Sequence, residues 1–531
     1  MRRWNGWGDE ATLYPLPPSA ADYLEQCVGA GQQIPDVSLK RALESVPPAR
    51  LPSETGIETG AQDRLFHARG QSLPDWVALR QGRVDSYPDG VAYPGSLEEI
   101  RRLLDFVREN GVRLIPYGGG TSVVGHINPL CNPDPVLTVD LSRLNQLIQL
   151  DETSHLATFG VGANGPQIEA SLNPLGYTLG HFPQSFELST LGGWIATRSC
   201  GQQSYYYGRI GDLFAGGHLE TLAGSLDLPC LPASAAGPDL RQFILGSEGR
   251  LGILTQATVR VRPLPETEAF YGVFFKDWES GMQAVRQIAQ ERVALSMLRL
   301  SDEEETRTTL ALSGKDQWVR WAQRGLGWLG YGPHPCLLVF GVTGQRGPAR
   351  QAYRWAISIV RAHHGLPTGG AVGNLWRKSR FLTPYLRNTL WEQGYALDTL
   401  ETAIPWKEVN ALAVVVKRAI LTGLDDFEEH VLVFAHLSHV YEDGASLYVT
   451  YLFRRSPDPD ETLERWRRLK RLASQVIVDH RGTISHQHGV GYDHAPYLPA
   501  EKGAAGMQLL EAACQALDPR GLLNPGKLLI R

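Results

Sequence analysis

Three consecutive glycines at positions 118–120 constrain this chain more strongly than any other feature of its sequence. They follow the apolar run Val112-Arg-Leu-Ile115, whose branched side chains predict a buried strand. Glycine destabilises the interior of regular elements, but it can adopt positive φ and bring backbone N–H groups close to an anion. The segment therefore predicts either a tight connection or a phosphate-binding loop that begins where a strand ends.

The residues around the glycines predict the unit that carries this loop. Ser96 and Glu99 have the spacing of a capping box, and the apolar residues that follow them fall on one helical face. Another strand is expected at 136–140. The order is thus helix, strand, glycine loop and strand. In this order the loop backbone would face a phosphate, without a helix N-terminus behind it.

Two later segments also predict loops that approach a ligand closely. Residues 182–201 combine a glycine pair, which could lie against a planar ring, with several Ser and Thr hydroxyls. Residues 243–255 carry a glycine at every third position from Gly246 to Gly252, a density that would destabilise a helix. Either segment alone is weak support for a binding site.

The pattern of apolar residues changes after residue 265, where longer amphipathic helices begin to alternate with strands. This alternation predicts an α+β domain. The elements expected before the change are a hairpin at 147–150 and 155–159, a helix at 165–172 and a strand at 257–262; those after it are helices at 281–291 and 349–363 and strands at 273–275, 337–340 and 447–453.

In order along the chain, these segments resemble the flavin domain of the vanillyl-alcohol oxidase superfamily, and within it the alkylglycerone-phosphate synthases. The resemblance begins at Trp4-Asn-Gly-Trp-Gly8 and covers nearly the whole chain. It implies an α+β fold with a two-subdomain vanillyl-alcohol oxidase type FAD-binding domain and an α+β cap domain containing an antiparallel sheet. The expected divisions are an N-terminal arm at 1–80, the FAD-binding domain at 81–265, the substrate cap at 266–480 and a C-terminal segment at 481–531 that folds back near the flavin.

The resemblance also implies FAD as the cofactor, held by the three glycine-bearing segments. Some members of the superfamily link the flavin to a histidine in the glycine loop. No histidine lies between residues 116 and 122, so we expect FAD to bind noncovalently. The positions that match the flavin-binding motifs are Pro116, Tyr117, Gly118, Gly119, Gly120, Thr121, Ser122, Pro183, Ser185, Ser189, Thr190, Gly192, Gly193, Thr197, Ser199, Glu248, Gly249, Leu251, Gly252 and Ile253.

A histidine pair near the C-terminus is the first candidate for catalysis. In Ser485-His-Gln-His-Gly-Val-Gly491 two imidazoles stand two positions apart, and each could transfer a proton or bind a metal near neutral pH. No carboxylate cluster with ligand spacing adjoins them, so no metal is expected, although Asp493 and His494 leave that reading open. The synthases carry three consecutive histidines here, and the middle one has a proton-transfer role. His486 and His488 are kept, whereas Gln487 cannot exchange a proton.

Three cap residues match other functional positions of the synthases. Arg299 and Arg387 would hold an anionic head with their guanidinium forks, and Tyr448 would donate a hydrogen bond to a substrate oxygen. For each arginine a surface ion pair is the alternative. Asp398 or Glu401 is expected to orient Arg387.

Composition excludes some classes of partner. The chain has 51 basic and 56 acidic residues, a net charge of −5 and no long basic run, so no nucleic acid is expected as a partner. Its six cysteines are far apart and form no C-x-x-C pair, as in a reduced cytoplasmic protein. Nowhere do about 18 apolar residues run together, so no membrane span is expected.

Two functions remain open. The first is a transferase that exchanges the acyl group of acyl-glycerone phosphate for a long-chain alcohol, without net redox, in ether lipid synthesis. The second is an FAD-dependent dehydrogenase or oxidase of a D-2-hydroxy acid or a glycerol 3-phosphate-like substrate, because His488-Gly-Val-Gly491 also resembles the G-E-H-G-[IV]-G tail of such enzymes. Either substrate has an anionic head, and the first also has an acyl or alkyl chain. The resemblance further implies a homodimer and peripheral membrane contact.

Overall fold

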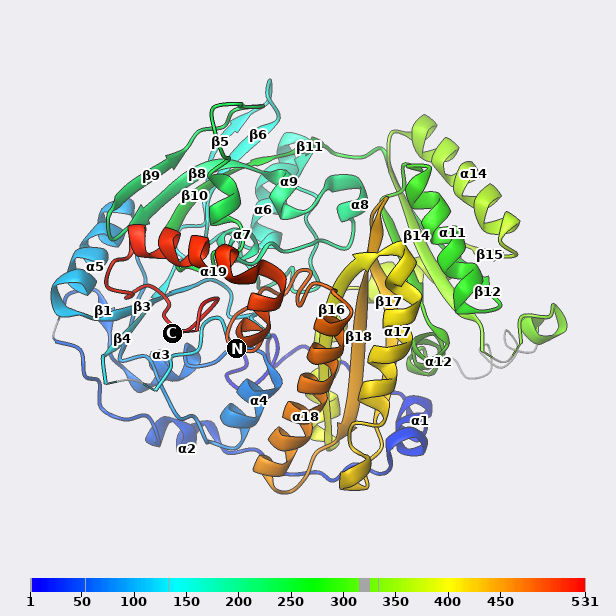
Figure 1. Ribbon diagram of the computed structural model, residues 1–531, viewed down its shortest axis with the longest axis horizontal. Helices are drawn as coiled ribbons and strands as arrows, with labels where there is room; N and C mark the ends of the chain where they lie inside the picture. The colour runs from blue at the N-terminus through cyan, green and yellow to red at the C-terminus, as the bar shows by residue number, and fades with distance from the viewer. Residues whose placement is uncertain (1, 53, 132, 315–324, 333, 531) are drawn as a thin grey trace.

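The computed structural model describes residues 2–52, 54–131, 133–314, 325–332 and 334–530. An N-terminal arm passes beneath both halves of the molecule (Figure 1). Among its hydrogen bonds to the cap is a reciprocal pair: the Trp7 N–H donates to Asn388 Oδ1 at 3.1 Å, and Asn388 Nδ2 donates to the Trp7 carbonyl at 3.0 Å. The arm contains α1 (Pro18–Val28), α2 (Leu39–Glu44), β1 (Ile57–Glu58), α3 (Ala61–Phe66) and α4 (Leu73–Arg80).

The first flavin subdomain contains the helix–strand–glycine unit that the sequence predicts. Ser96 accepts a hydrogen bond from the Glu99 N–H and caps α5 (Leu97–Asn110), which ends at the left-handed Gly111. A four-stranded sheet of order β1-β2-β4-β3 packs against α5. Its strands β2, β4 and β3 are parallel, so the glycine loop leaves the carboxyl end of β3. The bounds are β2 (Gly90–Ala92), β3 (Arg113–Tyr117) and β4 (Val136–Asp140).

The second flavin subdomain is an antiparallel sheet of order β5-β6-β10-β8-β9 with short helices on it. The expectation that residues 182–201 are all loop is wrong, because 191–197 form a helix, α7, that begins after Thr190. Gly192 and Gly193 lie in the first turn of α7, and Ile195 and Ala196 continue the helix. The strands are β5 (Leu147–Asp151), β6 (Leu156–Gly160), β7 (Tyr177–Thr178), β8 (Phe214–Thr221), β9 (Gly224–Leu228), β10 (Ile253–Arg260) and β11 (Arg262–Pro263); the helices are α6 (Gly165–Leu172), η1 (Asn173–Leu175), α7 (Leu191–Thr197), α8 (Ser204–Tyr207), α9 (Ile210–Leu213) and α10 (Arg241–Ile244).

The turn between β6 and α6 matches the G-x-G-x-x-G fingerprint of dinucleotide-binding folds, Gly160-Val-Gly-Ala-Asn-Gly165. The structure uses these glycines for packing. A Cβ at Gly160 would lie 2.4 Å from the Leu144 carbonyl oxygen, and one at Gly162 would lie 1.9 Å from that of Leu141. The glycines thus allow the turn to touch the neighbouring backbone, and the motif match does not mark the phosphate loop.

The cap is a seven-stranded antiparallel sheet of order β15-β12-β14-β13-β17-β18-β16. Helices α11, α14, α17 and α18 cover one face of the sheet, and the other face is turned toward the flavin subdomains (Figure 1). The fold is therefore the α+β architecture expected from the sequence. The strands are β12 (Thr267–Phe275), β13 (Met297–Ser301), β14 (Cys336–Gly344), β15 (Leu366–Gly369), β16 (Tyr395–Pro405), β17 (Leu432–Val440) and β18 (Gly444–Arg454); the helices are α11 (Trp278–Gln290), α12 (Glu303–Leu312), α14 (Arg346–Ala362), α15 (Gly370–Ser379), α16 (Thr383–Glu392), α17 (Trp406–Leu421), η2 (Asp425–Phe427) and α18 (Pro459–Asp479).

The C-terminal segment returns from the cap to the flavin subdomains. It holds η3 (Ala495–Tyr497) and α19 (Leu498–Leu517), and α19 lies across the flavin subdomains (Figure 1). Beyond α19, Leu523 bridges to Leu114 of β3, and Asn524 Nδ2 donates to the carbonyls of His126 and Glu248. The segment therefore holds two of the three glycine-bearing loops together. No helix among the residues described above is long and apolar enough to cross a membrane.

Candidate active site

A cavity of about 850 Å³ lies between the three glycine-bearing segments and the face of the cap sheet opposite helices α11, α14, α17 and α18. Most of the residues expected to bind FAD or substrate line it. Three do not: Leu251 and Ile253 are buried in the flavin-domain core, and His486 lies behind the cavity wall. The expected residues that do line it are Pro116, Tyr117, Gly118, Gly119, Gly120, Thr121, Ser122, Pro183, Ser185, Ser189, Thr190, Gly192, Gly193, Thr197, Ser199, Glu248, Gly249, Gly252, Arg299, Arg387, Tyr448 and His488.

The glycine loop is shaped by contact with the other two segments. A Cβ at Gly118 would lie 2.3 Å from Thr190 Oγ1, and one at Gly119 would lie 1.8 Å from the Leu188 carbonyl oxygen. Gly249 has a φ of +76°, and its missing side chain leaves room for Pro116. The three segments can form one continuous wall because these positions have no side chain.

This wall has the chemistry that a dinucleotide phosphate requires. The N–H groups of Gly119, Gly120 and Thr121 donate to no acceptor among the described residues. Arg2 donates to the Gly119 carbonyl at 2.9 Å and to the Tyr117 hydroxyl at 3.0 Å, so the loop's carbonyl side is occupied while its N–H groups stay free. Free loop amides beside a cavity form a site for an anion, so the segment fits the FAD pyrophosphate.

The cap strands supply the opposite wall with alternating side chains. On β17, Phe434 and His436 face the cavity, and on β18, Tyr448 and Thr450 do so. The residues between them are buried in the core on the helix-covered face. The two-residue period of a strand therefore brings Tyr448 and His436 into a stack with ring centroids 5.1 Å apart.

Arg387 is a cavity cation whose guanidinium is only partly satisfied. It donates from Nη1 to the Gln71 carbonyl of the arm and lies 4.3 Å from the centre of the Trp76 ring. Its buried Nε and Nη2 find no hydrogen-bond partner among the described residues. Burial lowers the pKa of Arg387, yet arginine stays charged in proteins. A buried charge with free donors indicates an anion-binding position.

Two acidic residues near Arg387 do not orient it as expected. The Asp398 carboxylate accepts from Trp466 Nε1 at 2.6 Å and from the Tyr451 hydroxyl at 3.3 Å. Glu401 accepts from the loop that carries the histidines. The packing of Arg387 against the arm sets its position instead, a long-range contact that the local sequence could not reveal.

Arg299 belongs to a compensated cluster. Its Nη2 donates to Glu305 Oε1 at 2.6 Å, and His436 Nδ1 lies 2.9 Å from the same oxygen. Burial acts to raise the pKa of Glu305, but Arg299 and His436 outweigh it and hold that pKa well below the usual range. Arg299 is thus already paired, and Arg387 is the stronger candidate for the substrate's charge.

The loop that carries the two histidines is organised by the fully buried Glu401. Its Oε1 accepts from the backbone N–H groups of Gln487 at 2.6 Å and His488 at 2.7 Å, and from the Ser485 hydroxyl at 3.2 Å. This turns the His488 ring toward the cavity, 5.6 Å from the Tyr448 ring. His486 points the other way, with Nε2 2.6 Å from the Tyr441 hydroxyl.

We expect Glu401→Ala to destabilise the protein and loosen this loop. Two buried N–H groups would lose their acceptor, at about 1–3 kcal/mol each. Thermal unfolding should show a clear fall in Tm, and turnover should drop with it. Glu464→Ala, which removes an exposed carboxylate from α18, serves as the control and should leave both unchanged. A Glu401→Ala protein with wild-type Tm and turnover would contradict this role.

The structure adds polar residues that the sequence did not single out. His126, His436 and His439 line the cavity, as does Glu305. His436 could have been found from the strand alternation that places it level with Tyr448. His439 could not, because it faces the cavity only through a β-bulge between Leu437 and His439 in β17.

Glu248 has a different contact from the one expected. It lines the cavity, but its carboxylate accepts from the N–H groups of Val490 at 2.6 Å and Gly491 at 2.8 Å, and its Oε1 lies 3.1 Å from His126 Nε2. Glu248 therefore ties the third flavin segment to the turn that follows His488.

Comparisons with known proteins agree with this architecture. The FAD binding domain model matches residues 88–226, and the model of the C-terminal domain of FAD linked oxidases matches residues 264–528. The chain is 29% identical to an alkyldihydroxyacetonephosphate synthase of Dictyostelium discoideum, covering 99% of this chain and 93% of the relative, and 28% identical to one of Trypanosoma brucei brucei, covering 99% and 92%. A solved alkyldihydroxyacetonephosphate synthase superposes with a TM-score of 0.85 at 26% identity over 99% of this chain and 98% of that one.

Proposed function

Because this chain is an FAD-dependent enzyme that resembles alkyldihydroxyacetonephosphate synthases along nearly its whole length, we propose that it exchanges the acyl group of an acyl-glycerone phosphate for a long-chain alcohol. The product would be an ether lipid precursor, and the reaction involves no net redox. The observation that carries the proposal is the shape of the cavity, which is polar and cationic at one end and apolar along the rest.

The polar end suits a phosphate head beside a ketone. Arg387 offers two free guanidinium N–H directions, and bidentate donation is the usual way in which arginine holds phosphate. Tyr448 donates its hydroxyl to Thr399 Oγ1 at 3.1 Å, and burial raises its pKa, so it stays protonated. Its single proton can turn from Thr399 to a substrate oxygen when substrate binds. Both groups are fixed by packing before substrate binds.

The apolar part suits a hydrocarbon chain. It runs between the cap sheet and helix α1 of the arm, and many of the side chains that line it are apolar. Burying one CH₂ group stabilises by about 0.8 kcal/mol, so a long chain here contributes much of the binding free energy. The apolar lining residues include Leu16, Ala20, Leu24, Leu310, Leu312, Leu337, Val339, Leu390, Leu432, Phe434 and Leu452.

His488 is the group placed to move a proton. Burial, followed by the charges of Lys470 and His126, lowers its pKa against the opposing pull of Glu401 and Asp398. The ring is therefore neutral at pH 7 and can act as a base for the alcohol. FAD, when bound along the three glycine-bearing segments, supplies the isoalloxazine ring on which this family of enzymes depends.

We expect Arg387→Lys to weaken turnover even though the charge is kept. An ammonium group cannot donate in two parallel directions to a phosphate, and it cannot stack on Trp76 as a planar guanidinium does. Loss of one charge-assisted hydrogen bond is worth about 1.5–3 kcal/mol, roughly 10- to 150-fold in kcat/KM. Arg467→Lys on the exposed face of α18 provides the matched control. Full activity of Arg387→Lys at limiting and saturating substrate would exclude direct head-group binding.

A direct assay separates the two candidate functions. The purified yellow protein is supplied with palmitoyl-glycerone phosphate and hexadecanol, and the ether product and released palmitate are measured by mass spectrometry. Equal amounts of both, with the flavin still oxidised, support the exchange reaction. If no ether forms and D-lactate, D-2-hydroxyglutarate or glycerol 3-phosphate bleaches the flavin anaerobically, the enzyme is the dehydrogenase.

Peripheral membrane contact is part of the proposal, because both lipid substrates reside in membranes. Trp328 is 88% exposed and Leu329 62% exposed, on a segment whose Leu326 packs with Trp376 of α15. Leu375 of the same helix lines the apolar cavity and is itself exposed. These side chains could lie on a lipid surface near the end of the cavity that takes the chain.

Two further expectations belong to the same proposal. A cytoplasmic location is supported by the six cysteines, which lie far apart in the sequence and form no C-x-x-C pair. A homodimer rests on the resemblance to the synthases alone. Size-exclusion chromatography with light scattering would determine the oligomeric state.

A further inference from the structure

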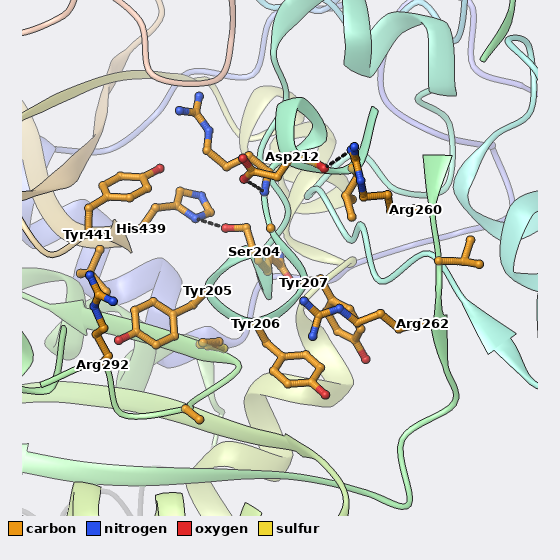
Figure 2. Close-up of a pocket in the computed structure, with 18 of the residues that line it drawn as sticks. Ser204, Tyr205, Tyr206, Tyr207, Asp212, Arg260, Arg262, Arg292, His439 and Tyr441 are labelled. Atoms are coloured by element: carbon orange, nitrogen blue, oxygen red, sulfur yellow. Dashed lines mark hydrogen bonds between the residues drawn. The ribbon is translucent and has the colours of Figure 1, made fainter. Parts of the chain in front are cut away.

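A second hollow, an open cleft of about 1300 Å³, lies between the flavin subdomains and the cap, on the other side of the cavity wall. Tyr205, Tyr206 and Tyr207 of α8 form part of it, with Arg260 and Arg262 beside them (Figure 2). The cleft contains none of the residues expected to bind FAD or substrate. Among the described residues, Gln202, Met297, Ser438 and His439 line both hollows, and of these four only His439 has a titratable side chain.

The bulge in β17 gives His439 this position. Leu437 pairs with Leu447, but His439 pairs with Ser446, so Ser438 is the additional residue. Without the bulge His439 would take the opposite face, since side chains alternate along a strand. Bulges that redirect a side chain occur often beside active sites. The strand thus departs from regular pairing at the residue that separates cavity from cleft.

The two ring nitrogens of His439 face different surroundings. Nδ1 lies 3.1 Å from the hydroxyl oxygen of Ser204, which lines the open cleft (Figure 2). It also lies 3.3 Å from Cys200 Sγ. With Nδ1 so occupied, Nε2 is the nitrogen left for the cavity side, where Gln487 adjoins the ring. Burial, with the charge of Arg209, lowers the pKa of His439 to about 3, so the resting ring is neutral and would release an added proton quickly.

The proposed exchange leaves one proton to be removed. The bond from carbon to the acyl oxygen breaks, and a bond from that carbon to the alcohol oxygen forms, with no net change in electrons. The fatty acid leaves as a carboxylate, because the pKa of a carboxyl group is about 4. The hydroxyl proton of the alcohol must therefore reach solvent once per turnover. FAD and a chain-bearing substrate occupy the cavity, which hinders escape through the cavity itself.

We propose that His439 and Ser204 conduct this proton from the active-site cavity to the open cleft. The proton arrives at His439 Nε2 directly or from His488, the proton on Nδ1 passes to Ser204 Oγ, and the Ser204 hydroxyl proton passes to water in the cleft. Each transfer returns the donor to its starting charge. The role rests on the proposed exchange reaction and adds to it a path through His439, the titratable side chain among the described residues that line both hollows.

The test is turnover of Ser204→Ala holoenzyme with palmitoyl-glycerone phosphate and hexadecanol, at fixed pH and ionic strength, as the imidazole concentration is raised. We expect kcat to fall about ten-fold, less than the 10² or more of a lost general base, because water can partly replace a hydroxyl. Imidazole entering from the cleft should restore the rate in a saturable manner. His439→Gln should fall further and also recover with imidazole.

Two controls keep the test specific. Ser204→Thr keeps the hydroxyl and should recover most of the rate that Ser204→Ala loses. Ser154→Ala removes a hydroxyl from the rim of the same cleft, at a residue tied to Asp151, and should have no effect. Neither control nor wild type should respond to imidazole.

The outcomes separate the two levels of the proposal. Suppose that the wild type forms ether and that Ser204→Ala either keeps the wild-type rate or has a lowered rate that imidazole does not restore. This result would overturn the proton path and leave the exchange reaction standing. A wild-type enzyme that forms no ether would overturn the exchange reaction, and the proton path with it.

Discussion

Replacing His488 with alanine should lower turnover by about 10² to 10⁴, roughly 3–5 kcal/mol of transition-state stabilisation, while FAD stays bound. We propose this imidazole as the proton-transferring group; it lines the cavity near Tyr448, and its backbone is held by Glu401 independently of the ring. Stopped assays give the rate, and the visible spectrum of the desalted protein gives the flavin content. The expected loss is in kcat more than in KM.

The pH profile provides a second measurement for the same residue. A base must be neutral to act, and burial favours the neutral ring by lowering the pKa of His488 from 6.5. The acid limb of the kcat profile should therefore lie below pH 6.5. Gln487→His, next to it, is the matched variant and should be tolerated. If His488→Ala retains full activity, Tyr448 or His439 becomes the candidate for proton transfer.

Replacing Gly119 with valine should abolish flavin retention. The reason is packing: a Cβ here would lie 1.8 Å from the Leu188 carbonyl oxygen, so the glycine loop and the second flavin segment could no longer touch. Both walls of the phosphate site would shift. The measurement is the ratio of 450 nm to 280 nm absorbance after desalting, with circular dichroism to establish that the fold persists.

Gly347→Val is the control, because a Cβ at that exposed position meets nothing within 4 Å. Acid precipitation of wild type should release all the yellow colour into the supernatant, as noncovalent binding requires. Colour retained by the acid-precipitated wild type would contradict noncovalent binding. A Gly119→Val protein that stays yellow would show that the loops tolerate the larger side chain.

The local patterns in the sequence predicted local structure well. The Ser96 cap, the strand at 136–140 and the helix at 165–172 occur where expected, because capping and periodicity act within a few residues. The glycine-bearing segments were recognisable by resemblance and do line one cavity. The helix at 191–197 was missed because two glycines masked its first turn.

Long-range contacts explain what the sequence could not provide. The partner of Arg387 is a backbone carbonyl at residue 71, and the partners of Glu401 are backbone amides more than 80 residues away. No local rule connects such positions. The G-x-G-x-x-G at 160–165 shows the converse, since a motif with the right spacing serves only to pack one turn on another.

The hydrogen bonds between Trp7 and Asn388 place constraints on the order of events during synthesis. Their partners are 381 residues apart in the sequence. At roughly 5–20 residues per second, the ribosome needs about 20–75 s to add those residues, and only then can the arm pack against the cap. Until then the apolar face of α1 has no cap to cover it. The nascent arm is therefore the segment most open to proteases and to chaperone binding, and pulse-labelled chains should acquire resistance there last.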